Sequence, residues 1–155
     1  MQKVRLGVLG MGRQGQIHSR NIAHMIPEAE LVCASDISME RVEKIGIDGV
    51  ELYDDYRRVL ERKDLDGIVV ATSTDTHEEV VRAAADASLH MLCEKPIATT
   101  LPAIDALLDV VDRAGVKFMV AFNRRFDPTF ARVRGLVADG TVGAPMIVNI
   151  TSRDP

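Results

Sequence analysis

Short apolar runs alternate with longer amphipathic stretches along almost the whole chain. The runs predict strands at residues 4–9, 29–35, 50–53, 67–71, 91–93 and 116–122, and the stretches between them predict helices. Residues 67–71 read Gly-Ile-Val-Val-Ala, an uninterrupted run typical of a strand that is buried on both faces. This alternation predicts an α/β fold, a doubly wound parallel sheet with crossover helices on both faces.

Capping residues and helical spacing define the expected helices. The expected N-terminal caps are Ser38 for a helix through residue 44, Asp54 or Asp55 for the next helix, and Thr76 in a capping box with Glu79. That last helix should run to about residue 87. Apolar residues at helical spacing predict a further helix that ends at Gly115, with Ile104, Leu107, Leu108 and Val111 on one face.

A glycine-rich turn joins the first strand to the first helix. It reads Gly10-Met11-Gly12-Arg13-Gln14-Gly15, which is the G-x-G-x-x-G pattern in the strand–turn–helix context that dinucleotide binding requires. Gly10 permits the tight turn, Gly12 lets the backbone approach a pyrophosphate, and Gly15 lets the helix lie close to the strand. The N–H groups at the start of the helix can bind the anion. We therefore assign Gly10, Gly12, Arg13, Gln14 and Gly15 to a cofactor site.

An acidic residue follows the second strand at the spacing expected for a ribose-binding group. Asp36 comes directly after the apolar run 29–35, and its carboxylate would accept hydrogen bonds from a ribose 2′-OH and repel a 2′-phosphate. Ile37 and Ser38 supply no positive charge, so the expected cofactor is NAD rather than NADP. Arg41 is the one nearby cation that a 2′-phosphate could attract.

The end of the chain predicts the beginning of a second domain. Residues 128–138 predict a helix with Phe130, Val133 and Val137 on its inner face, and residues 139–140 predict a turn. Residues 146–151 predict one more strand, with nothing after it to cover it. The expected organisation is a Rossmann dinucleotide-binding domain at 1–140, and at 141–155 the truncated start of a further domain.

Composition and charge exclude several classes of function. The 155 residues carry 19 Lys+Arg against 23 Asp+Glu, so the chain lacks the broad positive surface that nucleic-acid backbones require. No apolar run has the length of a signal peptide or a membrane span. Cys33 and Cys93 lie in strands without metal-ligand spacing, which favours buried, reduced thiols over a disulfide or a metal site. A cytoplasmic protein is expected.

The segments that follow the fourth, fifth and sixth strands should converge, because ligands bind beyond the carboxyl ends of parallel strands. The first segment contains Thr72, Ser73, Thr74 and His77, the second reads Glu94-Lys95-Pro96, and the third contains Arg125. Lys95 could donate to a substrate hydroxyl and favour a developing alkoxide, or could simply pair with Glu94 at the surface. His77 could contact the cofactor or serve in capping or packing, and His18 and His24 are assigned no chemistry. A cis peptide before Pro96 is possible.

These motifs together resemble the glucose-fructose oxidoreductase and inositol dehydrogenase (Gfo/Idh/MocA) family. The glycine turn, Asp36, residues 71–77, Glu94-Lys95-Pro96 and residues 123–127 occur in the family's order, and residues 122–127 with the ending 152–155 are most similar to the inositol 2-dehydrogenase branch. The resemblance implies an NAD-dependent dehydrogenase acting on a polyol or sugar. It implies that Lys95 contacts the reacting hydroxyl and that Arg125 orients the polyol. Thr72, Ser73, Thr74, His77, Glu94 and Lys95 are expected to contact the cofactor.

The resemblance also implies a part that this sequence lacks. Family members carry their catalytic base as a histidine, four residues after an aspartate, in a second α/β domain that binds substrate and builds the oligomer. Asp86 and His90 have this spacing here, but they lie at the amino end of the fifth strand, opposite the cofactor. The chain alone is therefore expected to bind NAD without efficient turnover, as a monomer or a non-native dimer of what is a homo-oligomer in the full enzyme. The alternatives are a non-catalytic nucleotide sensor, and a reductase of the same family acting on an imine or a pyrrole pigment.

Overall fold

The computed structural model describes residues 2–151 and 153. It contains a six-stranded sheet in which neighbouring strands are all parallel, in the order β3-β2-β1-β4-β5-β6. The strands are β1 (Val4–Leu9), β2 (Ala29–Ser35), β3 (Glu51–Tyr53), β4 (Gly67–Val70), β5 (His90–Cys93) and β6 (Phe118–Val120). The helices are α1 (Arg13–Met25), α2 (Met39–Glu43), α3 (Tyr56–Leu60), α4 (His77–Asp86), α5 (Leu101–Ala114) and α6 (Pro128–Ala138), with short 3₁₀ turns η1 (Thr74–Thr76) and η2 (Asn123–Phe126). The predicted α/β class and parallel sheet are confirmed.

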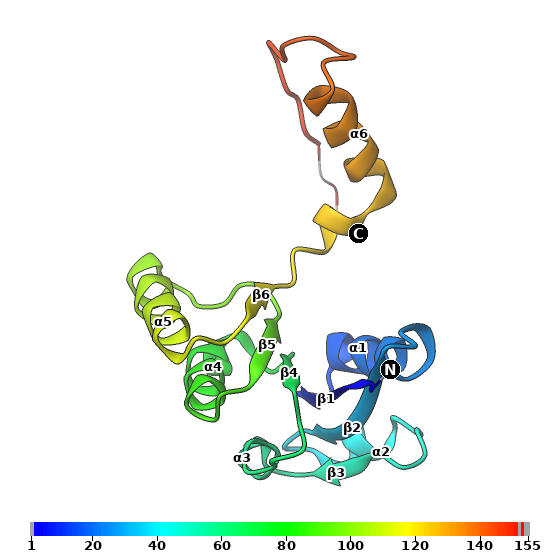
Figure 1. Cartoon of the computed structure of the whole chain (residues 1–155), viewed down its shortest axis with the longest axis vertical. Helices are drawn as coiled ribbons and strands as arrows, with labels where there is room; N and C mark the ends of the chain where they lie inside the picture. The colour runs from blue at the N-terminus through cyan, green and yellow to red at the C-terminus, as the bar shows by residue number, and fades with distance from the viewer. Residues whose placement is uncertain (1, 152, 154–155) are drawn as a thin grey trace. The chain divides into compact units, whose positions relative to one another are not determined.

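Helices cover the sheet on both faces and form two separate hydrophobic cores. One core gathers apolar residues of α3, α4 and α5, including Val59, Val80 and Leu107, and the other gathers residues of α1 and α2, including Ile22 and Val42. Figure 1 shows α4 and α5 on one side of β4–β6 and α1 on the other. Strands buried between two helical layers explain the continuous apolar runs in the sequence.

The chain reverses its direction of travel across the sheet between β1 and β4. From β1 the next strands are added on one side, whereas β4, β5 and β6 follow one another on the other side. The loops that leave the carboxyl ends of β1 and β4 therefore diverge and leave a crevice, which is where open α/β sheets bind ligands.

Two predicted helix caps are wrong and a third is confirmed. Asp55 accepts a hydrogen bond from the Arg57 amide at the start of α3, as expected. Ser38 and Thr76 stand at the N-cap positions of α2 and α4, but neither side chain accepts a hydrogen bond from its helix. Instead, the Ser38 amide donates to Asp36, and the Thr76 hydroxyl donates to the Ser73 carbonyl and lies 2.9 Å from the Thr72 hydroxyl. At Thr76 the turn before the helix thus engages the hydroxyl that would have capped α4.

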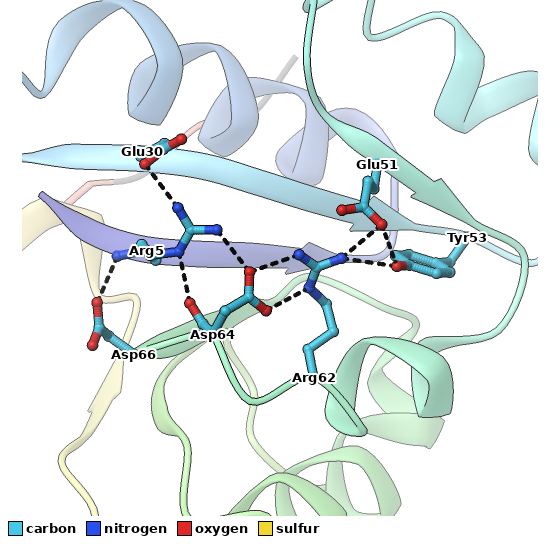
Figure 2. Close-up of polar contacts among 7 residues, drawn as sticks. All are labelled: Arg5, Glu30, Glu51, Tyr53, Arg62, Asp64 and Asp66. Carbon is cyan, nitrogen blue, oxygen red and sulfur yellow. Dashed lines mark hydrogen bonds and ion pairs between the residues drawn. The ribbon is translucent and has the colours of Figure 1, made fainter.

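A charged network ties the strands to the loop before β4 (Figure 2). Arg5 of β1 donates to the Asp64 carboxylate at 2.7 Å, and Arg62 donates to both oxygens of the same carboxylate at 2.7 and 2.9 Å. The other members are Glu30, Glu51, Tyr53 and Asp66. Hydrogen bonds from the two arginines hold the pKa of Asp64 well below its usual range. No pattern in the sequence predicts this network, because its members come from distant segments.

The residues divide into two compact units, up to Ala121 and from Phe122 onward. In the second unit α6 has the predicted bounds, but its predicted inner face is wrong, since Phe130, Val133 and Val137 are 47%, 57% and 41% exposed. One helix with an extended segment cannot form a core of its own. The predicted strand at 146–151 is also absent, because a strand needs a hydrogen-bonded neighbour and the described residues supply none there.

Candidate cofactor site

The glycine turn after β1 has the close contacts that its sequence predicts. Gly10 has φ = +88°, a conformation that side chains disfavour, and a Cβ there would lie 2.5 Å from the Ala71 carbonyl oxygen. A Cβ on Gly15 would lie 1.8 Å from the Gly10 carbonyl oxygen. These two glycines therefore let α1 begin directly against the carboxyl ends of β1 and β4.

The first turn of α1 presents free backbone amides. Gly12 is the N-cap residue, no side chain caps the helix, and no acidic residue lies in its first turn. Arg13 and Gln14 are exposed there, and a Cβ on Gly12 would meet nothing within 4 Å. Uncapped amides at the positive end of a 13-residue helix, beside an open backbone, form a cradle that suits a pyrophosphate. The residues present thus fit a dinucleotide.

Asp36 supports the glycine turn as well as facing the cleft. Its carboxylate accepts hydrogen bonds from the buried Met11 amide at 2.7 Å and from the Ser38 amide at 2.9 Å. The Arg41 guanidinium lies 3.8 Å from the carboxylate. The side chain is only 6% exposed, so these amides fix its orientation. Each carboxylate oxygen keeps acceptor capacity beyond its one amide partner, and the contact with a ribose hydroxyl stays a prediction.

A cleft of about 670 Å³ lies at the carboxyl ends of β1, β2 and β4. Four of the residues predicted for the cofactor site line it, namely Gly10, Asp36, Thr72 and Ser73. Thr74 is half-buried at the start of η1 and is not among the lining residues. The structure thus brings together the loops after three strands, while the roles of their individual residues stay predictions.

Side chains of α3, which were not predicted for the site, also line this cleft. Tyr56 donates to the Glu79 carboxylate of α4 at 2.6 Å, and Arg57 donates to the same carboxylate at 2.7 Å. Burial and the hydrogen bond to Glu79 raise the pKa of Tyr56 to about 12. The available signal was position, because Tyr56 and Arg57 directly follow the carboxyl end of β3.

Lys95 leaves the carboxyl end of β5 as an exposed side chain. No carboxylate in residues 2–151 or 153 forms an ion pair with its ammonium group, so the alternative of a surface pair with Glu94 is not what the structure contains. The Glu94 carboxylate instead lies 2.8 Å from Nε2 of His18 on α1. The Lys95–Pro96 peptide bond is cis.

His77 occupies a buried position between two loops. It is 1% exposed, its Nδ1 lies 2.8 Å from the Pro96 carbonyl oxygen, and its Nε2 lies 3.1 Å from the Thr72 carbonyl oxygen. These contacts agree with the packing interpretation of His77, and a direct cofactor contact stays a prediction. Both His18 and His77 thus contact the segment around Lys95, an arrangement that no motif or spacing predicts.

The remaining candidates lie elsewhere. His90 begins β5, four residues after the end of α4 at Asp86, and its Nδ1 accepts a hydrogen bond from the Lys117 amide. This places the Asp86–His90 spacing at the amino end of the sheet, as expected. Arg125 is exposed in η2, within the second unit. Among the described residues, no three histidine, cysteine or acidic side chains gather as a metal site, and no helix is long and apolar enough to cross a membrane.

Residues 4–122 match the model of an oxidoreductase family with an NAD-binding Rossmann fold, Gfo/Idh/MocA. The chain belongs to this family. The match covers every strand of the sheet, the glycine turn, Asp36 and the Glu94-Lys95-Pro96 segment. The Gfo/Idh/MocA assignment carries NAD as the cofactor, which agrees with the cradle at the start of α1.

Relatives within Gfo/Idh/MocA include inositol dehydrogenases. The chain is 39% identical to the myo-inositol 2-dehydrogenase of Thermotoga maritima over 98% of its own length and 46% of that protein. The scyllo-inositol dehydrogenase of Lactobacillus casei, solved with NAD(H) and scyllo-inositol, superposes with a TM-score of 0.86 at 29% identity, covering 92% of this chain and 43% of that one. The myo-inositol dehydrogenase of the same organism, in complex with NAD(H) and myo-inositol, gives 0.85 at 30% identity, covering 93% and 44%. The chain thus spans about half the length of the curated relatives it matches.

Proposed function

We propose that this chain is the NAD-binding half of a dehydrogenase that oxidises a cyclic polyol, with myo-inositol as the first substrate to test. The observation that carries the proposal is the exposed Lys95 at the carboxyl end of β5, the same end of the sheet at which the glycine turn leaves β1. The names of its relatives, which include myo-inositol and scyllo-inositol dehydrogenases, support the substrate class.

The cofactor would be held by backbone and by few side chains. The uncapped amides after Gly12 would bind the pyrophosphate, and Asp36 would accept from the adenosine ribose. When bound, NAD supplies the acceptor for the hydride that leaves the substrate carbon. Thr72 and Ser73 would line the cleft between the pyrophosphate site and the ribose site.

Lys95 would act on the substrate hydroxyl. Its ammonium group has no carboxylate partner in the described part of the chain, so its donors are free for a substrate oxygen. A positive charge beside that oxygen stabilises the alkoxide that develops as the base takes the hydroxyl proton, and this alkoxide becomes the carbonyl when the hydride leaves. A surface ion pair would have neutralised this charge.

The general base is proposed to come from outside the residues described. His90 stands at the amino end of β5, and His77 is buried between carbonyl groups, so neither can take a proton from a hydroxyl at Lys95. We propose a histidine in a substrate-binding half, corresponding to the length that the relatives have beyond this chain, with Arg125 helping to orient the polyol and that half building a homo-oligomer. The two cysteines are free and buried, which supports a reducing compartment such as the cytoplasm.

Two measurements test the proposal. The chain should bind NADH and should not reduce NAD in the presence of myo-inositol, until it is joined to the proposed substrate half. In the joined enzyme, Lys95→Ala should lower kcat by about 10² to 10⁴-fold with little change in NADH affinity. Lys117→Ala is the matched control, since Lys117 is an exposed lysine just before β6, at the opposite end of the sheet. Full turnover in the joined Lys95→Ala enzyme would mean that a different group acts on the hydroxyl, and a joined protein that binds NADH without any turnover would favour the nucleotide sensor.

A further inference from the structure

Each neighbour of Lys95 in the sequence is held by a histidine from a different helix. Before Lys95, the Glu94 carboxylate lies 2.8 Å from Nε2 of His18, which projects from α1. After Lys95, the Pro96 carbonyl oxygen lies 2.8 Å from Nδ1 of His77, the first residue of α4. The two helices belong to different hydrophobic cores, so Lys95 is bracketed from both faces of the sheet.

We propose that His18 and His77 are positioning residues for Lys95, which together fix the direction in which its side chain leaves β5. The inference rests on the proposed function of Lys95 and adds the means by which an exposed, flexible side chain is aimed. Lysine has a long, flexible side chain, and a backbone fixed on both sides of it gives the ammonium group a defined direction from which to reach the substrate.

The contact made by His18 is well suited to this role. The side chains of His18 and Glu94 are 22% and 15% exposed, so solvent competes little for the hydrogen bond between them. Nε2 must donate, because a carboxylate only accepts. The Glu94 amide also donates to the Val70 carbonyl at 2.9 Å, which fixes the backbone on one side while His18 fixes the side chain on the other.

The contact made by His77 is buried and spans two loops. Its second ring nitrogen faces the Thr72 carbonyl at 3.1 Å, so the ring lies between the loop after β4 and the loop after β5. Carbonyl oxygens only accept, and a neutral imidazole has one N–H. We assign the ring N–H hydrogen of His77 to Nδ1, because its contact with the Pro96 carbonyl is shorter than that of Nε2 with the Thr72 carbonyl.

Replacing a histidine by asparagine or glutamine keeps one side-chain N–H donor, so such variants test the contacts of His18 and His77 one at a time. The amide nitrogen of asparagine occupies roughly the place of Nδ1 and that of glutamine the place of Nε2. His18→Gln should therefore keep the bond to Glu94, whereas His18→Leu removes it. At the buried site, His77→Asn should keep the bond to Pro96, whereas His77→Gln can reach only Thr72. His18→Gln and His18→Leu are similar in size, and His77→Asn and His77→Gln are similar in polarity. His24→Leu, at an exposed position on the same helix as His18, is the control.

The readout is the NMR signal of Lys95 in the 155-residue chain after ¹³C-methylation of its five lysines, with Lys95→Arg giving the assignment. We expect one sharp Lys95 signal that shifts on NADH saturation, unchanged in His18→Gln, His77→Asn and His24→Leu. In His18→Leu and His77→Gln the signal should broaden or lose at least half of its NADH-induced shift. Equal behaviour of the two members in each pair would overturn the proposal.

The outcomes separate this proposal from the proposed function. If NADH binds to the wild-type chain without shifting the Lys95 signal, Lys95 does not lie at the cofactor. That result contradicts the proposed function of Lys95, and with it the positioning role of the two histidines. A signal that NADH moves equally in every variant overturns only the positioning role. If the buried His77 variants do not fold, the half-exposed His18 pair decides the matter alone.

Discussion

Two glycines of the same turn should respond to alanine in opposite ways. At Gly15 a Cβ would lie 1.8 Å from the Gly10 carbonyl oxygen and 2.9 Å from its carbon, both backbone atoms that cannot rotate away. At Gly12 a Cβ would meet no protein atom within 4 Å, and φ is −65°, which alanine adopts without strain. Gly15→Ala should therefore damage the fold, and Gly12→Ala should damage only the binding of the pyrophosphate.

The magnitudes follow from the contacts. Forcing an extra methyl group into a rigid site costs about 3 kcal/mol, and alanine returns about 1 kcal/mol of helix propensity, so Gly15→Ala should lose about 2 kcal/mol. For a domain of this size that lowers Tm by roughly 4–8 °C. Gly12→Ala loses only about 0.5 kcal/mol as a poorer N-cap residue. Its methyl group stands where the anion must approach, so NADH affinity should fall at least tenfold, about 1.4 kcal/mol.

Thermal unfolding and calorimetric titration with NADH measure both effects on the same samples. A Gly15→Ala variant that melts with the wild type would refute the close packing of α1 on β1. A Gly12→Ala variant that melts with the wild type and also binds NADH as tightly would show that the dinucleotide does not use this turn. We expect Gly15→Ala to have a lowered Tm, and Gly12→Ala to have nearly the wild-type Tm but a weaker affinity for NADH.

Three further predictions concern side chains. Titration with both cofactors should show NAD bound at least tenfold more tightly than NADP, because the fixed carboxylate of Asp36 repels a 2′-phosphate; equal affinities would mean that Arg41 overrides it. Because Asp64 has a lowered pKa in the folded state, its stabilising effect is fully present above its ordinary pKa of 3.8, begins to decrease below that value and is lost as the pH falls through the lowered folded-state pKa. Urea unfolding of wild type and Asp64→Asn from pH 7 to pH 2 should give a difference in unfolding free energy that is constant down to about pH 4 and narrows below it, and a difference that stays constant to pH 2 would contradict this. Burial raises the pKa of the Cys33 and Cys93 thiols to about 12, so neither should react with a thiol reagent at pH 8 until the chain unfolds, and rapid labelling of the folded chain would contradict their burial.

The sequence predicted those features that depend on neighbours in the chain. The glycine turn, the strand before it and the bounds of α6 follow from local backbone preferences and hydrophobic period, and the structure has all of them. Thr76 shows the limit of local patterns, because its hydroxyl donates to the Ser73 carbonyl and accepts no hydrogen bond from the helix that it was predicted to cap.

Contacts between distant residues were beyond sequence reasoning. His18 and Glu94 are 76 positions apart, and His77 and Pro96 are 19 apart, so no spacing rule connects them. The Arg62–Asp64 network joins segments that become neighbours only when the sheet forms. The predicted strand at 146–151 had the right composition, yet composition cannot supply the partner that a strand requires.

Titration of the purified 155-residue chain with NADH tests the central claim most directly. The account predicts a folded chain that binds one NADH, with affinity lost in Gly12→Ala and retained in Lys117→Ala. A chain that is folded by circular dichroism and binds no NADH at millimolar concentration would contradict it.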